Sequence, residues 1–229
     1  MIKRIIVAID GPAAAGKGEA AKRLAARLGF LHIDTGAMYR AVALAALRSS
    51  IPFDDHHRVG ALAAHASIRL TEDRRVLLNG EDVTPFIRTP EIDQGASKVS
   101  AIPAVRRALV AEQRRMAENA SVVMEGRDIG TVVFPDAHVK FYLDAEPHER
   151  ARRRQKQQLV EKGLDLPFED VLKEIRERDL RDSSRPDSPL RQAADAIVVD
   201  TTSLSPEQVE EELLRLVRER TSNGKEVTR

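Results

Sequence analysis

A glycine-rich segment close to the N-terminus has the residues and the spacing needed to bind phosphate groups. The segment Gly11-Pro12-Ala13-Ala14-Ala15-Gly16-Lys17 fits the pattern G-x-x-x-x-G-K. Its glycines let backbone N–H groups curl around phosphate oxygens, and the N-terminus of a following helix adds positive potential. The ammonium group of Lys17 would reach the β- and γ-phosphates. We therefore expect residues 11–17 to bind a nucleoside triphosphate.

The two residues after this lysine differ from the usual pattern. Gly18 stands where most phosphate loops have Ser or Thr, and Glu19 follows it. The loops of nucleoside-monophosphate kinases often read G-K-G-T, so Glu19 replaces a hydroxyl that would contact phosphate or the hydration shell of Mg²⁺. A carboxylate there repels phosphate unless it turns outward or holds a metal-bound water. The sequence leaves open how well the donor site works.

Three further groups of charged and polar residues could form a second binding site. Taken alone, each has an ordinary structural explanation, such as helix packing, a local ion pair or a solvated, salt-bridged helix face. Two of the groups follow predicted strands, and the third has i, i+4 and i+7 spacing, which places it on one face of a helix. In chain order the groups are Asp34, Thr35, Tyr39 and Arg40; Glu125, Arg127 and Asp128; and Arg178, Asp182 and Arg185.

Short apolar runs predict the strands that must position these residues. Residues 5–9 form a continuous aliphatic run, which is typical of a strand buried on both faces of a parallel sheet. Ligands of open α/β sheets bind at the carboxyl ends of the strands, where the phosphate loop and the segments at Asp34 and Glu125 all fall. The expected fold class is therefore α/β. Further strands are predicted at 31–33, 122–124, 139–143 and 196–199.

Turn and capping residues predict the remaining elements. Asn79-Gly80, within the short runs of residues 68–83, indicates an antiparallel hairpin that would be an insert on the main sheet. Ser205 to Gln208 is a capping box for a closing helix, and residues 221–229 read as a frayed polar tail. Other helices are predicted around Ala20 to Leu28 with Gly29 as C-cap, over 37–48, from Pro103, from Pro147, and through Phe168 to Ile175.

The composition excludes several classes of protein. Lys and Arg number 37 against 36 Asp and Glu, and this net charge of +1 argues against a broad nucleic-acid-binding surface. The absence of Cys excludes disulfides and thiolate metal sites. The first apolar run stops at Asp10, too early for a signal peptide, and no run is long enough to span a membrane. We expect one cytoplasmic domain over residues 1–229, with neither a nucleic-acid polymer nor a membrane as partner.

The histidines show no pattern that would hold a metal ion. The adjacent pair His56-His57 is expected in an exposed loop. No direct protein ligand to a metal is therefore predicted. The six histidines are His32, His56, His57, His65, His138 and His148.

Taken together, these motifs resemble the bacterial cytidylate kinase family over nearly the whole chain. The segment from Ile33 to Arg40 is similar to the family's substrate segment, and residues 79–84 and 87–90 are similar to its insert. Residues 125–136 resemble its most distinctive stretch, and residues 177–182 its helix near the lid. The resemblance implies a P-loop kinase fold with a five-stranded parallel sheet, a nucleoside-monophosphate-binding insert at about 60–90 and a helical lid at about 150–185.

The resemblance also implies an activity and a role for each candidate residue. The family transfers the γ-phosphoryl group of ATP to CMP or dCMP, in pyrimidine nucleotide metabolism, and needs Mg²⁺ with the ATP. Lys17 and the loop from Gly11 to Glu19 would hold the donor, and Glu125 would orient waters on Mg²⁺ without binding it directly. The remaining implied roles are Arg40 and Arg127 for the acceptor phosphate, Asp34, Thr35 and Tyr39 near the acceptor, Ser97, Arg106 and Asp128 for cytosine, Arg178 and Asp182 for ribose, Arg185 for base or phosphate, and Arg150 and Arg154 for ATP as the lid closes.

Two alternatives stay open at this point. One is a kinase for another small acceptor, such as UMP, AMP or a hydroxy acid. The other is a nucleotide-binding regulatory module without catalysis, which only Glu19 favours. A monomer is expected, since no large apolar helix face suggests an obligate partner. The sequence does not distinguish a preference for CMP from one for dCMP.

Overall fold

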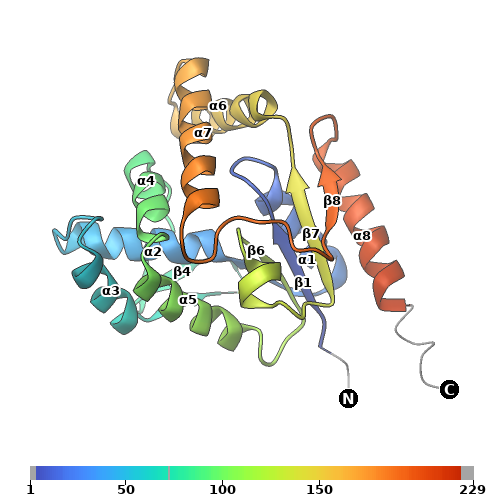
Figure 1. The fold of residues 1–229 in the computed structure, drawn as a ribbon, viewed down its shortest axis with the longest axis horizontal. Helices are drawn as coiled ribbons and strands as arrows, with labels where there is room; N and C mark the ends of the chain where they lie inside the picture. The colour runs from blue at the N-terminus through green and yellow to red at the C-terminus, as the bar shows by residue number, and fades with distance from the viewer. Residues whose placement is uncertain (1–3, 72, 223–229) are drawn as a thin grey trace.

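The computed structural model describes residues 4–71 and 73–222, and Figure 1 shows its fold. The predicted tail at 221–229 lies almost entirely outside these residues. In chain order the elements are β1 (Ile6–Asp10), α1 (Lys17–Leu28), β2 (Leu31–Asp34), α2 (Thr35–Arg48), α3 (His56–His65), β3 (Ile68–Leu70), β4 (Val76–Leu78), β5 (Glu81–Asp82), α4 (Pro90–Val99), α5 (Pro103–Met116), β6 (Val122–Glu125), the π-helix η1 (Ile129–Val133), β7 (Val139–Asp144), α6 (Pro147–Lys162), α7 (Phe168–Ser184), β8 (Ile197–Asp200) and α8 (Pro206–Ser222).

A five-stranded parallel sheet forms the centre of the molecule, which confirms the predicted fold class. Its strand order is β2-β6-β1-β7-β8. The register pairs Ile9 of β1 with Glu125 of β6 and with Phe141 of β7, and pairs Asp34 of β2 with Glu125. Because the strands are parallel, their carboxyl ends lie along one edge, and the candidate residues that follow them are brought together.

Helices cover both faces of this sheet, which explains why β1 is apolar up to its last residue, Asp10. On one face Val7 and Ile9 pack in a cluster with Leu24 of α1 and Leu213 of α8. On the other face Ala8 packs in a cluster with residues of β6 and η1. A strand that is buried on both sides loses the alternation of apolar and polar residues, so the unbroken run of residues 5–9 is the expected signature.

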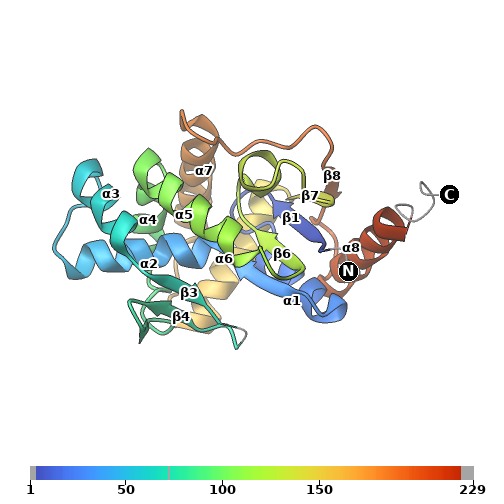
Figure 2. The same ribbon diagram turned by 90° about the horizontal axis from the view of Figure 1, so that it is seen from below.

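The predicted antiparallel hairpin is present as a separate three-stranded sheet in the order β3-β4-β5. Asn79 and Gly80 form its turn, with positive φ angles of 52° and 88°, as a two-residue hairpin turn requires. This sheet lies beside α2 in Figure 2. Its residues Ile68, Val76 and Leu78 share an apolar cluster with the helices α2 to α5.

Three local predictions need correction. Residues His56-His57 were expected in a loop, but they begin α3, because the Asp55 side chain caps that helix by accepting the Arg58 N–H. Helix α2 begins two residues before the predicted residue 37, because Asp34 caps it. Arg185 is not on the helical face with Arg178 and Asp182, since α7 ends at Ser184.

The predicted capping box is confirmed: Ser205 Oγ accepts the Gln208 N–H, and the Gln208 side chain accepts the Ser205 N–H.

Helices α6 and α7 pack against each other beyond the carboxyl ends of the strands (Figure 1). Val171, Leu172 and Ile175 of α7 form a small apolar cluster with Ala151 of α6, and Ala14 of the glycine-rich loop packs against it. These two helices therefore rest directly on the predicted phosphate loop.

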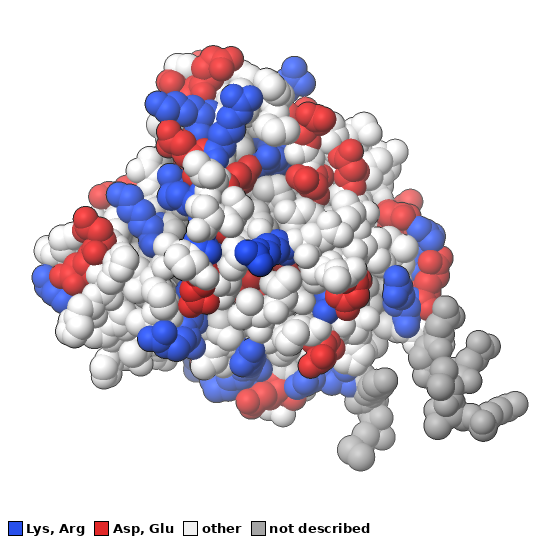
Figure 3. Space-filling view, in the orientation of Figure 1, with Lys and Arg blue, Asp and Glu red and all other residues white. Residues whose placement is uncertain are grey.

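The surface reflects the balanced composition. Figure 3 shows basic and acidic side chains interspersed over the face it presents. Within residues 4–71 and 73–222, each helix is too short or too polar to cross a membrane.

The close approach of Gly11 to strand β7 gives a test of this packing. A Cβ atom at Gly11 would lie 1.9 Å from the Leu143 carbonyl oxygen, and its φ of +146° also disfavours a side chain. We expect Gly11→Ala to lower the free energy of unfolding by at least about 3 kcal/mol, because the backbone of β7 cannot yield. Urea unfolding would measure this loss. The control is Gly29→Ala, where φ is +66° but no described atom lies within 4 Å, so the expected loss is about 1 kcal/mol. Equal losses in the two variants would contradict the steric explanation.

Candidate active site

The glycine-rich loop wraps into a phosphate-binding conformation between β1 and α1. Ala14 and Gly16 have positive φ angles of 59° and 87°. Lys17 is the first residue of α1, it is buried, and its Nζ donates to the Pro12 carbonyl oxygen at 2.5 Å. Burial lowers the pKa of Lys17 well below its ordinary value, and the nearby Arg127 cation adds to this shift. A phosphate anion at this position would relieve both effects.

The departures at residues 18 and 19 have separate structural explanations. A Cβ atom at Gly18 would lie 3.3 Å from Oε1 of Glu125, so glycine leaves room for that carboxylate beside the start of α1. His32 Nε2 lies 3.3 Å from the same oxygen. Glu19 is exposed, and its carboxylate accepts from Arg23 Nε at 2.6 Å, which lowers the pKa of Glu19.

Charged residues from three segments meet at the inner end of the cleft. Asp128 pairs with Arg106 through a short contact and lies 3.8 Å from Arg185, and all three side chains are buried. The Arg106 guanidinium lies 5.8 Å from the centre of the Tyr39 ring. Burial raises the pKa of Tyr39 to about 12, so its hydroxyl stays protonated. This end of the cleft offers a carboxylate and neutral or cationic hydrogen-bond donors around an aromatic ring.

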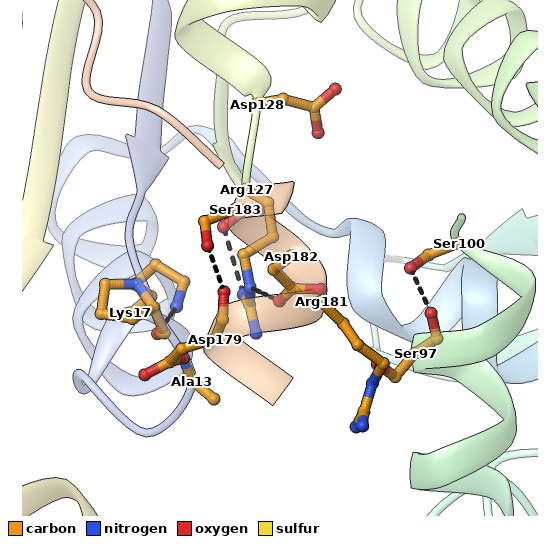
Figure 4. Close-up of polar contacts among 12 residues, drawn as sticks. Ala13, Lys17, Ser97, Ser100, Arg127, Asp128, Asp179, Arg181, Asp182 and Ser183 are labelled. Carbon is orange, nitrogen blue, oxygen red and sulfur yellow. Dashed lines mark hydrogen bonds and ion pairs between the residues drawn. The ribbon is translucent and has the colours of Figure 1, made fainter. Parts of the chain in front are cut away.

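A group of cations lies between this end and the phosphate loop. Arg127 donates to Asp182 at 2.9 Å, and Figure 4 shows this pair lying between Lys17 and Ser97. Enclosure lowers the pKa of Arg178 to about 10, and the neighbouring Arg127 contributes to the shift. The Nε atoms of Arg40 and Arg178 are buried with no hydrogen-bond partner in the described chain. Crowded guanidinium groups with unused donors are suited to bind a phosphate group.

The predicted lid arginines occupy different positions. Arg150 is buried and donates to the Ala13 carbonyl oxygen and to Asp179, so it holds α6 against the phosphate loop. Arg154 pairs with Asp93 of α4 at 2.7 Å, and its side chain lines the cleft.

One cleft of about 1390 Å³ connects these groups. Gly11, Pro12, Ser97 and Arg150 do not line it, although Ser97 lies close by and accepts from Arg181 at 3.3 Å. The other candidates all line it: Ala13, Ala14, Ala15, Gly16, Lys17, Gly18, Glu19, Asp34, Thr35, Tyr39, Arg40, Arg106, Glu125, Arg127, Asp128, Arg154, Arg178, Asp182 and Arg185.

Several residues that shape the cleft were missed in the sequence. Asp179 accepts the Ala13 N–H at 3.3 Å and also holds Arg150, and Asp93 joins Arg154 and Lys162. Arg153 lines the cleft and approaches the loop there: its Nη1 atom lies 3.9 Å from the place that a Cβ atom at Gly16 would take. Arg150 also contacts the loop, but it does not line the cleft. No local pattern marks these residues, because their partners lie far away in the chain.

Asp10 is a further missed residue. It follows the apolar run of β1 and could be read only as the end of a strand. Its buried carboxylate accepts the N–H groups of Ile129 at 2.8 Å and Gly130 at 2.7 Å. It thereby ties the strand that enters the phosphate loop to the segment that follows Asp128.

The fold and the cleft define a class of protein, the P-loop kinases. The glycine-rich loop stands at one end of the cleft, and a cluster of arginine side chains lies beyond it. A solved gluconokinase from Sinorhizobium meliloti has the same fold, with a TM-score of 0.50 at 14% identity, covering 98% of this chain and 99% of its own.

Sequence comparison identifies the particular family. A sequence model described as cytidylate kinase matches residues 7–219. The cytidylate kinase of Solibacter usitatus is 56% identical over 225 residues, covering 98% of this chain and 97% of its own. That of Caldanaerobacter subterraneus is 51% identical over 215 residues, covering 94% and 95%. The chain belongs to the cytidylate kinase family, as the sequence motifs predicted.

The buried carboxyl group of Asp10 predicts an unusual pH dependence of stability. Burial raises the pKa of Asp10 from 3.8 to about 6, so the folded protein takes up this proton more readily than the unfolded chain. The wild type should therefore gain stability relative to Asp10→Asn as the pH falls from 7 to 5, by about 1 kcal/mol. Urea unfolding of both proteins at pH 7, 6 and 5 measures the difference. A constant difference would show that this carboxyl group titrates normally.

Proposed function

We propose that this chain transfers the γ-phosphoryl group of ATP to CMP or dCMP, giving ADP and CDP or dCDP. The observation that carries the proposal is the buried Asp128–Arg106 pair, which lies in the same cleft as the phosphate loop. Membership of the cytidylate kinase family supports the same reaction. The cleft then binds one nucleotide at each end, with their phosphates meeting beside Arg127.

At the donor end, the loop amides and Lys17 hold the phosphates of ATP. The Glu125 carboxylate lines the cleft beside the loop, 3.3 Å from the position of a Gly18 Cβ atom. Among residues 4–71 and 73–222, no three His, Cys, Asp or Glu side chains are grouped so that they could hold a metal ion. One carboxylate beside a phosphate site fits Mg²⁺, which keeps several waters and binds mainly through the nucleotide. Glu125 would hold those waters, and the ion would neutralise charge on the β- and γ-phosphates.

At the acceptor end, Asp128 and Arg106 read the edge of the cytosine base. The Asp128 carboxylate accepts from the exocyclic amine, and Arg106 donates to the carbonyl side of the base, with Ser97 nearby. Uracil has an oxygen in place of the amine, which would leave the buried carboxylate unpaired and repelled. Tyr39 forms a wall beside Arg106, and its ring is 5.8 Å from the guanidinium.

The acceptor phosphate and ribose bind in the middle of the cleft. Arg40 and Arg127 grip the phosphate through their paired donors, as guanidinium groups do with planar sets of oxygens. Asp34 holds Arg40 at 2.8 Å, and Asp182 holds Arg127 at 2.9 Å, so both forks are oriented before the substrate arrives. Arg178 and Asp182 contact the ribose, and Arg185 supports Asp128. Thr35 donates to the Glu125 carbonyl oxygen at 2.7 Å and fixes the start of α2.

Transfer in this cleft is a matter of positioning and charge. An oxygen of the acceptor phosphate attacks the γ-phosphorus of ATP, and the bond from that phosphorus to the β-phosphate oxygen breaks. Lys17, Arg127 and Arg178 neutralise charge on the groups being transferred.

Helices α6 and α7 cover the cleft, with Arg154 at its edge and Arg150 fixed to the loop. Exclusion of water by this lid suppresses hydrolysis of ATP. The chain acts as a monomer in this proposal.

Acceptor specificity tests the role of Asp128. The variant Asp128→Asn puts a side-chain amide, with an N–H₂ donor, in place of a carboxylate that only accepts, so kcat/KM for CMP should fall by about 100-fold or more. Its preference for CMP over UMP should shrink at the same time. Release of ADP in a coupled assay with ATP, Mg²⁺ and each acceptor measures both values. The exposed Asp136→Asn, in the same segment, is the matched control. An unchanged CMP preference in Asp128→Asn would contradict the assignment of the base site, and wild-type preference for UMP would contradict the proposed substrate.

Glu19 provides the only sequence argument for a non-catalytic nucleotide-binding module. Because its carboxylate is paired with Arg23 on the helix surface, it is held away from the donor phosphates. We therefore expect Glu19→Thr to change kcat by less than about threefold, since neither side chain is required for transfer. Steady-state kinetics with CMP and ATP measure this change. Activity that appears only in Glu19→Thr would show that the carboxylate disables the native loop.

A further inference from the structure

Asp128, the residue proposed to bind the edge of the cytosine base, occupies a helix-capping position that its side chain does not use. Asp128 precedes the π-helix η1 at the N-cap position, and its side chain makes no capping hydrogen bond. An aspartate at this position normally accepts an N–H from the first turn of the helix. Here the carboxylate pairs instead with Arg106 and Arg185 in the cleft.

Asp10 supplies the missing cap from another strand. Its two carboxylate oxygens accept the N–H groups of Ile129 and Gly130 at 2.8 and 2.7 Å. These are the first two residues of η1, whose N–H groups have no partner within the helix. Asp10 is 4% exposed, so water does not satisfy these donors in its place. The carboxylate therefore performs the capping that the sequence position assigns to Asp128.

The surroundings leave η1 little freedom to shift. A Cβ atom at Gly130 would lie 3.1 Å from the Lys140 side chain and 3.4 Å from Asp10 Oδ2. The Gly126 N–H also donates to the Ile9 carbonyl oxygen at 3.0 Å. The segment from Gly126 to Gly130 is thus fastened at both ends to the last two residues of β1, which lead directly into the phosphate loop.

We propose that Asp10 is a positioning residue for acceptor recognition: by capping η1 in place of Asp128, it leaves the Asp128 carboxylate free to face the acceptor base. The inference rests on the proposed function. Asp10 touches neither nucleotide, and it acts on Asp128 through the backbone of residues 129 and 130. Removal of its two acceptors would let Asp128 turn back and cap its own helix, so the cleft would lose base discrimination before it lost phosphate binding.

Two substitutions at Asp10 test this inference. In Asp10→Asn the N–H₂ group of the side-chain amide faces one of the backbone N–H groups of Ile129 and Gly130. In Asp10→Ser a single hydroxyl replaces two carboxylate acceptors. We expect the ratio of kcat/KM for CMP to that for UMP to fall by about tenfold in both variants. The reason is that an Asp128 carboxylate turned toward its own helix no longer accepts from the cytosine amine and no longer repels the uracil oxygen. The KM for ATP should stay within about twofold of wild type, since the loop contacts are backbone ones.

A buried control separates this role from simple destabilisation. Val217→Ala in α8 removes packing from the cluster under the same sheet, away from the cleft. It should lower Tm while leaving the CMP-to-UMP ratio unchanged. A ratio that stays at the wild-type value in folded Asp10→Asn and Asp10→Ser would overturn the proposal.

Hydrogen exchange in the wild type gives a test that needs no variant. The amides of Ile129 and Gly130 should exchange at least about 100-fold more slowly than exposed loop amides in nucleotide-free protein, because a buried carboxylate holds them. Exchange as fast as that of exposed loops would overturn the cap, and with it the inference. If the wild type instead shows the protection but no CMP-dependent release of ADP, the proposed function fails while the cap stands.

Discussion

Five arginines in and beside the cleft are each paired with an aspartate, and this pairing is the constraint on which the rest of the site depends. An unpaired guanidinium removed from water costs several kcal/mol, so a cleft built to receive phosphate must neutralise its own cations beforehand. The pairs are Arg40 with Asp34, Arg106 with Asp128, Arg127 with Asp182, Arg150 with Asp179 and Arg154 with Asp93. The pairs keep the guanidinium planes in fixed directions while leaving other donors of the same groups unused.

These pairs also decide which parts of the molecule are joined. Arg150 and Asp179 connect α6 and α7 to the phosphate loop, whereas Arg154, Lys162 and Asp93 connect α6 to α4 on the other side of the cleft. All three residues of the second connection line the cleft. In the proposed function, a phosphate bound by Arg154 would compete with Asp93 for the same guanidinium, and nucleotide binding would then be linked to the packing of α6 through one side chain.

The sequence predicted the framework well, because its signals are local. The unbroken run before Asp10, the Asn79-Gly80 turn and the capping box at Ser205 each depend on neighbouring residues, and each is present in the structure. The strand ends also brought most of the candidate residues into one cleft. Helix α3 was not predicted at all, and a single aspartate cap, at Asp55, decides where it starts.

The pairings themselves could not be read from the sequence. Asp10 and Ile129, or Arg150 and Ala13, are distant in the chain and show no spacing that relates them. Arg150 illustrates the difficulty, because its spacing from Arg154 on α6 suggests a shared ligand, yet the two side chains have different partners. Helical spacing indicates which residues share a face, but the neighbouring element decides what that face meets.

The approach of Gly18 to Glu125 links the residue after the phosphate-loop lysine to the end of strand β6. A Cβ atom at this position would lie 3.3 Å from Glu125 Oε1, so the common form of the loop, with a hydroxyl residue after the lysine, requires the Glu125 carboxylate to shift by a few tenths of an ångström. A side chain at residue 18 therefore acts first on the last residue of β6, which lies far away in the chain. The residue that follows the lysine and the carboxylate at the end of β6 share one space, so the size of the first limits where the second can stand.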